Sequence, residues 1–273
     1  MKGRNLYILQ HIILALIGII WIYPFIWTIS SSFKSEIGFF SANPWPGIFH
    51  FANFARAWNG AHFSAYFMNT VITTVATVAL VIAVSSLTGY ALGRVAFPGR
   101  KIIIGIIAAL LFVPQGFTII PFYQLMKGLG LNNNLLGIIL GQASGVHIMF
   151  ILMFSAYFRA IPQELEDAAS MDGCGFLRTF LSVMLPTAKP VIATVAIMQF
   201  ISSWNSFLIP LVLTLNSPNL RTLAVGMFSF VGTYNTDYTA MAAAATISVV
   251  PVIIIFIFAQ RYFMEGIAGA VKS

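Results

Sequence analysis

The chain has 273 residues, of which 59% are hydrophobic and only 8% are charged. Because soluble domains carry roughly 25% charged residues, this composition excludes an ordinary soluble fold and indicates a protein of the lipid bilayer. The net charge of +7 comes from basic residues scattered at the ends of apolar stretches, not from one patch, so it does not indicate nucleic-acid binding.

Six stretches between charged residues are long enough for a helix to cross the hydrocarbon core, which takes about 20 residues. We therefore predict an all-α polytopic membrane protein with six transmembrane helices, near residues 9–29, 66–92, 102–122, 136–158, 188–209 and 239–260. The expected organisation is an N-terminal tail, first helix and external loop over 1–65, a five-helix core over 66–260, and a C-terminal tail over 261–273.

Basic residues indicate which side of the membrane each loop occupies, because Lys and Arg are retained in the cytoplasm. An even number of spans places both termini on one side, and that side carries ten Lys and Arg residues. The other side carries only Lys34, Arg56, Lys127 and Arg221. Both termini, and the loop over 159–190, are predicted to be cytoplasmic.

Polar side chains recur inside the expected spans, where each needs a partner or water. Amides and hydroxyls suit hydrogen bonds to sugar hydroxyls, and a tryptophan suits stacking on a pyranose ring. The alternative is hydrogen bonding within the bundle, which for the histidine means a neutral imidazole. The candidates for a translocation path or substrate contact are Asn69, Gln142, His147, Gln199, Ser202, Ser203, Trp204 and Asn205.

Small residues also recur at four-residue spacing, which lets helix backbones approach closely in a membrane. One such stripe is Ser85, Gly89 and Gly93, and another is Gly137, Gly141 and Gly145. We interpret these stripes as packing within the chain, with a contact to a second membrane subunit as the alternative.

The sequence lacks the residues that several classes of function require. None of the expected spans contains a carboxylate, which speaks against a transporter driven by protons or sodium. The sequence has no HExxH, no paired-cysteine motif, no GxSxG and no GxxxxGK[ST] phosphate loop. We therefore expect no enzyme activity, no metal and no cofactor bound by this chain, and any ATP must be bound by another polypeptide.

Four of the seven carboxylates lie in one stretch, "ELEDAASMDGCGFLRTFLSVMLP", which runs from Glu164 to Pro186. Its composition predicts a helix over 164–171, with Pro162 in the first turn and the acids near the positive end of the helix dipole. Gly173 suits a left-handed turn, after which the apolar residues are expected to pack against the bundle. A solvated acidic loop is the alternative that the residues alone leave open.

The stretch "DAASMDGCGFLRTFLSVMLP" resembles the cytoplasmic EAA motif of binding-protein-dependent ABC importer permeases. Ala168, Ala169, Gly173, Leu185 and Pro186 match the motif at its spacing. Two positions depart from it, with Asp167 in place of the usual glutamate and Val183 in place of isoleucine.

The resemblance extends over nearly the whole chain. It is strongest to the carbohydrate-importer branch, in the style of the second membrane subunit of maltose permeases. Its marks are "SSFKSE" at 31–36, "SSWNSFLIPLVL" at 202–213 and "RYFMEGIAGAVKS" at 261–273.

This resemblance implies a subunit of a carbohydrate importer in a prokaryotic cell membrane. The implied partners are a second permease, two ATPase subunits or domains that hold ATP and Mg, and an extracytoplasmic solute-binding protein that contacts the loop over 216–237. The acidic stretch would be a coupling helix seated on the ATPase, with its contacts made by Glu166, Asp167, Ala168, Ala169, Asp172 and Gly173. An importer of the same architecture for another solute, a motor-independent channel and a secondary transporter are the alternatives.

Overall fold

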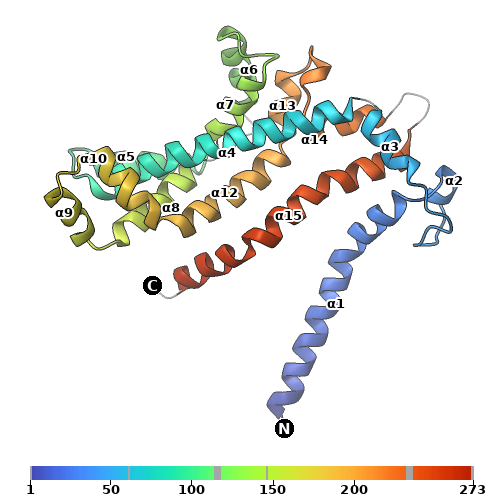
Figure 1. Ribbon diagram of the computed structural model, residues 1–273, viewed down its shortest axis with the longest axis horizontal. Coiled ribbons are helices and arrows are strands. Elements are labelled where there is room, and N and C mark those ends of the chain that lie inside the picture. The colour runs from blue at the N-terminus through green and yellow to red at the C-terminus, as the bar shows by residue number, and fades with distance from the viewer. Residues whose placement is uncertain (1, 61, 114–117, 146, 232–235, 272–273) are drawn as a thin grey trace. The chain divides into compact units, whose positions relative to one another are not determined.

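The computed structural model describes residues 2–60, 62–113, 118–145, 147–231 and 236–271, and in these ranges the side chains of 2–6, 145, 147, 229 and 259–271 are not described. In the described ranges the regular secondary structure is helical, apart from one isolated antiparallel bridge between Val231 and Thr236, and turns and loops connect the helices (Figure 1). The residues divide into two compact units, one made of 1–64 and 226–251 and the other of 65–225 and 252–273.

The first unit is built around the segment that follows the first helix. Asn53 is buried and its Nδ2 donates to the backbone oxygens of Ser32, at 2.9 Å, and Lys34, at 2.8 Å. The Lys34 ammonium is buried too, and donates to the Asn43 carbonyl at 2.7 Å. The helices of this unit are α1 (Lys2–Ser31), α2 (Glu36–Phe39), α3 (Ala52–Asn59), the short η4 (Met227–Phe230) and the first part of α15 (Tyr238–Val271).

Asp237 joins α3 to the start of α15 in the same unit. Its Oδ1 accepts from the backbone N–H of Ala240 at 2.8 Å, while the Arg56 Nε lies 3.2 Å from its Oδ2. Burial raises the pKa of Asp237, but the Ala240 N–H, the Arg56 guanidinium and the Thr239 hydroxyl outweigh that effect and hold the pKa below its usual value. The carboxylate is therefore held in its charged form.

The second unit is a bundle of helices with several breaks. Its longer members are α4 (Phe63–Arg94), α5 (Arg100–Leu110), α6 (Ile119–Gly128), α7 (Leu135–Gly145), α8 (His147–Ala160) and α12 (Lys189–Trp204). The shorter ones are α9 (Glu164–Met171), α10 (Phe176–Thr179), a π-helical turn (Phe180–Met184), α11 (Leu185–Thr187), α13 (Leu208–Leu213), η3 (Pro218–Leu220) and α14 (Leu223–Gly226).

Three described helices are long and apolar enough to cross a membrane unaided, namely the segments Tyr7–Ser31, Phe63–Arg94 and Tyr238–Phe258. They coincide with the first, second and sixth predicted spans. Two further candidates are helix pairs, bent by 58° between α7 and α8 and by 80° between α11 and α12. The third predicted span, 102–122, falls on α5 and α6, and its residues 114–117 lie outside the described ranges. Helix α15, which contains the sixth predicted span, continues to Val271, so the expected tail over 261–273 is helical through that residue.

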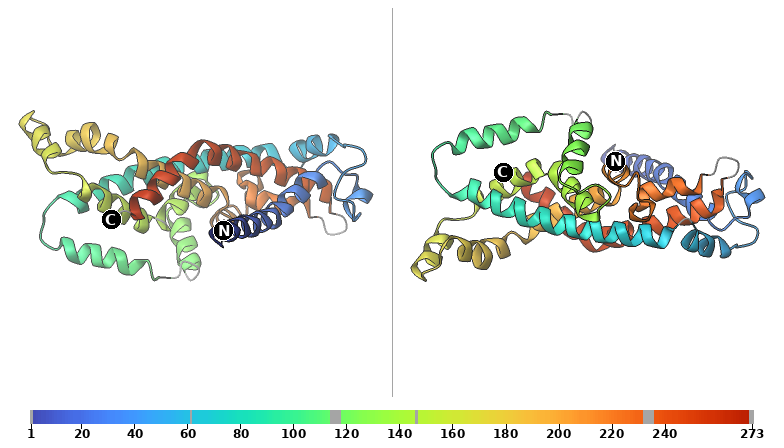
Figure 2. Two further views of the ribbon diagram at one scale, coloured as in Figure 1. Left: turned by 90° about the horizontal axis from the view of Figure 1, so that it is seen from below. Right: turned by 90° about the horizontal axis from the view of Figure 1, so that it is seen from above.

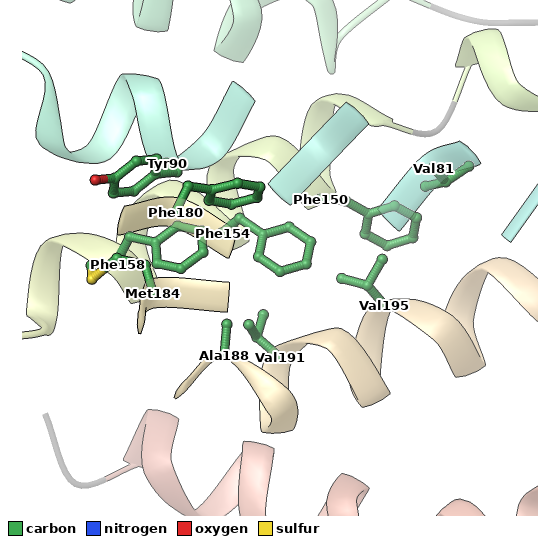
Figure 3. Close-up of a cluster of buried hydrophobic side chains, with 10 residues drawn as sticks. All are labelled: Val81, Tyr90, Phe150, Phe154, Phe158, Phe180, Met184, Ala188, Val191 and Val195. Carbon is green, nitrogen blue, oxygen red and sulfur yellow. The ribbon is translucent and has the colours of Figure 1, made fainter. Parts of the chain in front are cut away.

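A hydrophobic core joins α4, α8, the π-helical turn and α12 in the second unit. Figure 3 shows the side chains that form it: Val81, Tyr90, Phe150, Phe154, Phe158, Phe180, Met184, Ala188, Val191 and Val195. At Gly89 and Gly93, added Cβ atoms would lie 2.4 Å from the Phe154 Cβ and 2.9 Å from the Ser155 oxygen. The stripe at 85, 89 and 93 therefore packs within the chain, as predicted.

Candidate functional site

The acidic stretch forms α9, which has the bounds predicted from its composition. Gly173 follows with φ +76°, the left-handed conformation that glycine adopts without steric cost. The N–H groups of Gly173 and Cys174 donate to the carbonyls of Ser170, at 3.0 Å, and Ala169, at 2.9 Å, which is the Schellman pattern of a helix end. The predicted helix and turn are confirmed, but Pro162 precedes the Gln163 cap and is not in the first turn.

The apolar residues after the turn pack against the bundle, as expected. The ring of Phe176 stacks on Tyr90 of α4, with centroids 5.0 Å apart, and Phe180 does so at 5.3 Å. Phe180 and Met184 are buried in the core. Figures 1 and 2 show α9 and α10 beside the end of α4, which carries Arg94.

Glu166 is turned towards α4 and is buried, with 9% of its surface exposed. Its Oε1 accepts from the Tyr90 hydroxyl at 2.8 Å and its Oε2 accepts from Arg94 Nε at 2.6 Å. The other guanidinium nitrogens of Arg94 donate to the carbonyls of Ile161, at 3.0 Å, and Pro162, at 3.3 Å. Both carboxylate oxygens and the residues that enter α9 are thus bonded to one end of α4.

The opposite side of α9 faces outward. Asp167, Ala168 and Asp172 are exposed, as are Leu165 and Met171. Ala169, by contrast, is only 5% exposed and packs inside the chain. Glu166 and Ala169 are both among the residues expected to make the ATPase contacts, and the structure turns both of them towards the bundle. Gly173 remains at the exposed turn.

A cavity of about 240 Å³ lies in the first unit, and a larger one of about 840 Å³ lies in the second. The larger cavity is bordered by α5, α6, α7, α8, α12 and α13. Its polar lining includes Gln142, Ser144, Ser202, Ser203 and Ser206. Apolar side chains such as Phe122, Phe207 and Ile209 form much of the rest. Such a mixture of apolar wall and few polar groups is usual for small-molecule sites.

A hydrogen-bonded chain of polar groups connects this cavity to α4. Thr77 Oγ1 donates to Gln142 Oε1 at 3.3 Å, Gln142 Nε2 donates to the Ser203 carbonyl at 3.4 Å, and Gln199 Nε2 donates to Ser203 Oγ at 2.8 Å. Four of the predicted polar residues, Gln142, Gln199, Ser202 and Ser203, therefore lie in one region of α7 and α12. Gln199 itself is fully buried and is not part of the cavity wall.

The remaining polar candidates are placed elsewhere. Trp204 is 5% exposed and packs against Phe200 and Phe67, so its ring is not open for stacking on a sugar. Asn69 donates to the carbonyls of Asn219 and Arg221 and thereby holds the loop after α13. Asn205 is exposed and donates to the Ile201 carbonyl. The side chain of His147 lies outside the described residues.

Reasoning from the sequence alone misses Tyr90 and Arg94 as site residues. In the sequence, Arg94 is one of the ten Lys and Arg residues on the side predicted to be cytoplasmic. One sequence pattern could have indicated both residues: Arg94 directly follows the uncharged stretch over 57–93, and Tyr90 lies one helical turn before it.

The chain combines long apolar helices, the short helix α9 at the end of one of them, and a largely apolar cavity with a few polar groups between broken helices. These features are typical of a helical membrane permease. The chain belongs to the family described as "Binding-protein-dependent transport system inner membrane component", whose model matches residues 6–268. It is therefore an inner-membrane component of a transport system, which is a transport subunit and not a catalytic one.

Known relatives and a solved structure agree with this assignment. The chain is 35% identical to the diacetylchitobiose uptake system permease protein NgcG of Streptomyces coelicolor, over 100% of this chain and 89% of that protein. It is 33% identical to the arabinooligosaccharides transport system permease protein AraQ of Bacillus subtilis, over 84% of this chain and 81% of that one. A chain in the crystal structure of a bacterial ABC transporter involved in the import of the acidic polysaccharide alginate superposes with a TM-score of 0.87, at 27% identity over 96% of this chain and 98% of that chain.

Proposed function

We propose that this chain is the permease subunit of an ATP-driven importer that moves a carbohydrate across the inner membrane. An extracytoplasmic binding protein delivers the sugar, a second permease completes the pore, and two ATPase subunits or domains hold ATP and Mg. The chain crosses the membrane six times, with both termini and the loop over 159–190 in the cytoplasm.

The observation that carries this proposal is the position of α9 at the Arg94 end of α4. A helix of 32 residues is about 48 Å long, so its two ends reach opposite faces of a bilayer core of about 30 Å. α9, which is bonded to the Arg94 end of α4, is therefore on the face that this end reaches, and the Phe63 end of α4 reaches the other face. The excess of basic residues assigns the α9 face to the cytoplasm, where the ATPases are.

The outward side of α9 suits a seat on an ATPase. Ala168 is small and exposed, so two rigid surfaces can approach closely there. Asp167 and Asp172 are exposed beside it and can pair with basic residues, although such partly exposed pairs contribute only about 0.2–1 kcal/mol. Packing at Ala168 and the turn at Gly173 therefore provide most of the docking surface.

The cavity of about 840 Å³ is the proposed part of the translocation path in this chain. Gln142, Ser202 and Ser203 offer donors and acceptors for sugar hydroxyls, while the apolar wall suits the faces of the sugar rings. Trp204, Asn69 and Gln199 act in packing instead, because each is buried within the bundle. The loop over 216–237 is the proposed contact for the binding protein.

Reconstitution of the complex tests this function. The chain is purified in mild detergent with its co-purifying subunits, and ATP hydrolysis is measured with the cognate binding protein and a panel of diacetylchitobiose, arabinooligosaccharides, melibiose and raffinose. Stimulation by at least one sugar, and none by amino acids or phosphate, is expected. Stimulation only by amino acids or phosphate contradicts the carbohydrate assignment, and a preparation that never hydrolyses ATP contradicts the importer.

A further inference from the structure

We propose that Glu166 is a positioning residue that fixes the coupling helix α9 to the end of α4, so that displacement of α9 moves α4. This inference rests on the proposed function, in which α9 receives the movement of the ATPase. It gives Glu166 a role within the chain, distinct from the exposed acids that face outward.

Glu166 differs from the neighbouring acidic residues because its side chain is buried. Glu164, Asp167 and Asp172 are exposed, whereas the Glu166 side chain is 12% exposed and that of Arg94 is 9% exposed. A buried carboxylate is costly unless it is paired and hydrogen-bonded. Glu166 meets that condition through Arg94 and Tyr90, which belong to a single helix.

Arg94 also holds the chain that enters α9. Its Nη atoms donate to the carbonyls of Ile161 and Pro162, which lie between the end of α8 and the start of α9. One guanidinium therefore joins α4 both to the helix and to the segment that leads into it. A guanidinium presents five donors on three separate nitrogens in a planar fork, so each nitrogen of Arg94 can bond a different oxygen.

The dipoles of the two helices favour the pairing of Glu166 with Arg94. Glu166 lies in the first turn of α9, where the helix dipole is positive, and Arg94 lies in the last turn of α4, where the dipole is negative. The ring of Tyr90 also stacks with Phe176 and Phe180, which follow the turn after α9. The contacts on both sides of the α9–α10 turn thus converge on the same end of α4.

A matched pair of variants tests the role of Glu166. Glu166→Gln keeps the size of the side chain but removes its charge, and Glu164→Gln makes the same change at an exposed position of the same helix. In the reconstituted complex, with the sugar of the panel that stimulates the wild type, Glu166→Gln is expected to lower the ratio of stimulated to unstimulated hydrolysis by roughly tenfold. Glu164→Gln is expected to keep the wild-type ratio.

Covalent rescue separates positioning from a direct contact with the ATPase. In a Cys174→Ser background, which removes the single native cysteine, Arg94→Cys and Glu166→Cys are combined and joined by a short bismaleimide. The unlinked protein should be poorly stimulated, and the linked protein should recover stimulation although it has no carboxylate at 166. A fully linked complex that stays unstimulated contradicts the proposal.

A distance measurement provides a readout that does not depend on the transported solute. Spin labels at Met171 and Val95, which are exposed, report the separation of α9 from the end of α4. The wild type should give one narrow distribution, Glu166→Gln a broader one, and Tyr90→Phe, which removes only the hydroxyl, an intermediate one. Unchanged distributions in both variants overturn the proposal, whereas an unstimulated wild-type complex would count against the proposed function alone.

Discussion

The backbone of Gly89 on α4 lies against Phe154 on α8 so closely that a Cβ at position 89 would be 2.4 Å from the Phe154 Cβ. The Ile151 oxygen and the Ser155 nitrogen would each be 3.0 Å from the same atom. Small residues allow such close approach of helices in membranes, where the hydrophobic effect contributes little to association. Contact between α4 and α8 therefore requires glycine at this position.

Gly89→Ala is expected to destabilise the protein, because the added methyl group must push α8 away from α4. Overpacking of this kind costs about 1–3 kcal/mol. Thermal unfolding in detergent measures the effect, with Gly105→Ala as the control, since a Cβ at position 105 would have no neighbouring atom within 4 Å. A Gly89→Ala protein that unfolds at the wild-type temperature would contradict the packing described here.

Gly173→Val is expected to strain the turn after α9. The cost is roughly 1–2 kcal/mol, and it comes from the backbone alone, because Gly173 has φ +76° and a Cβ there would meet no atom within 4 Å. Gly175→Val is the control, since Gly175 has an extended backbone (φ −79°, ψ 172°) that valine readily adopts. Sugar-stimulated ATP hydrolysis should fall in the first variant far more than in the second. Normal coupling in Gly173→Val would show that the turn is not needed.

Ala168→Trp and Ala169→Trp should fail in different ways. Ala168 is exposed, so a tryptophan there should leave the fold intact and prevent the ATPase from binding, whereas buried Ala169 has no room for it. We expect a wild-type melting temperature with loss of co-purified ATPase for Ala168→Trp, and a lower melting temperature for Ala169→Trp. The opposite pattern would mean that Ala169, and not Ala168, forms the docking surface.

The acidic stretch shows how far the sequence determines the site. The bounds of α9 and the turn at Gly173 follow from local signals, namely helix-forming residues, acids in the first turn and a glycine. Which of the adjacent acids faces the bundle does not follow, because consecutive residues of a helix differ in direction by about 100° and the choice depends on where α4 lies. That is why Glu166, Ala169 and Arg94 could be assigned only from the structure.

For the membrane spans, too, the sequence predicts some features and not others. α1, α4 and α15 were predictable because each is a long apolar run. The bends of 58° and 80° were not, since hydropathy reports transfer into lipid and carries no information about the direction of the chain. The polarity of Trp204 and Asn69 likewise marked them as unusual, yet only their neighbours show that they pack within the bundle.

The Arg56–Asp237 pair predicts a dependence of stability on pH. The pKa of Asp237 is lowered in the folded protein, so the pair contributes stability above the unfolded pKa of about 3.9, and this contribution is lost as the pH falls through the folded pKa. Asp237→Asn should therefore lower the melting temperature at pH 7. The loss in the free energy of unfolding should be less than about 1 kcal/mol, because the pair is partly exposed. The difference between the variant and the wild type should vanish in acid.

Glu36→Gln is the control for that measurement, because Glu36 is an exposed acid of the same unit. Asparagine is also a good helix N-cap, so the bond to the Ala240 N–H can be kept in Asp237→Asn and the comparison isolates the charge. A difference that persists unchanged at low pH would show that the charge of Asp237 does not stabilise the unit.

The central claim is that this chain moves its solute only when an ATPase drives it through α9. Sugar uptake into proteoliposomes that contain the whole complex tests this most directly, with ATP or a non-hydrolysable analogue enclosed on the ATPase side. Uptake should require hydrolysable ATP and should be lost in the Ala168→Trp complex. Uptake that continues at the same rate with the analogue would contradict the account and would indicate a channel.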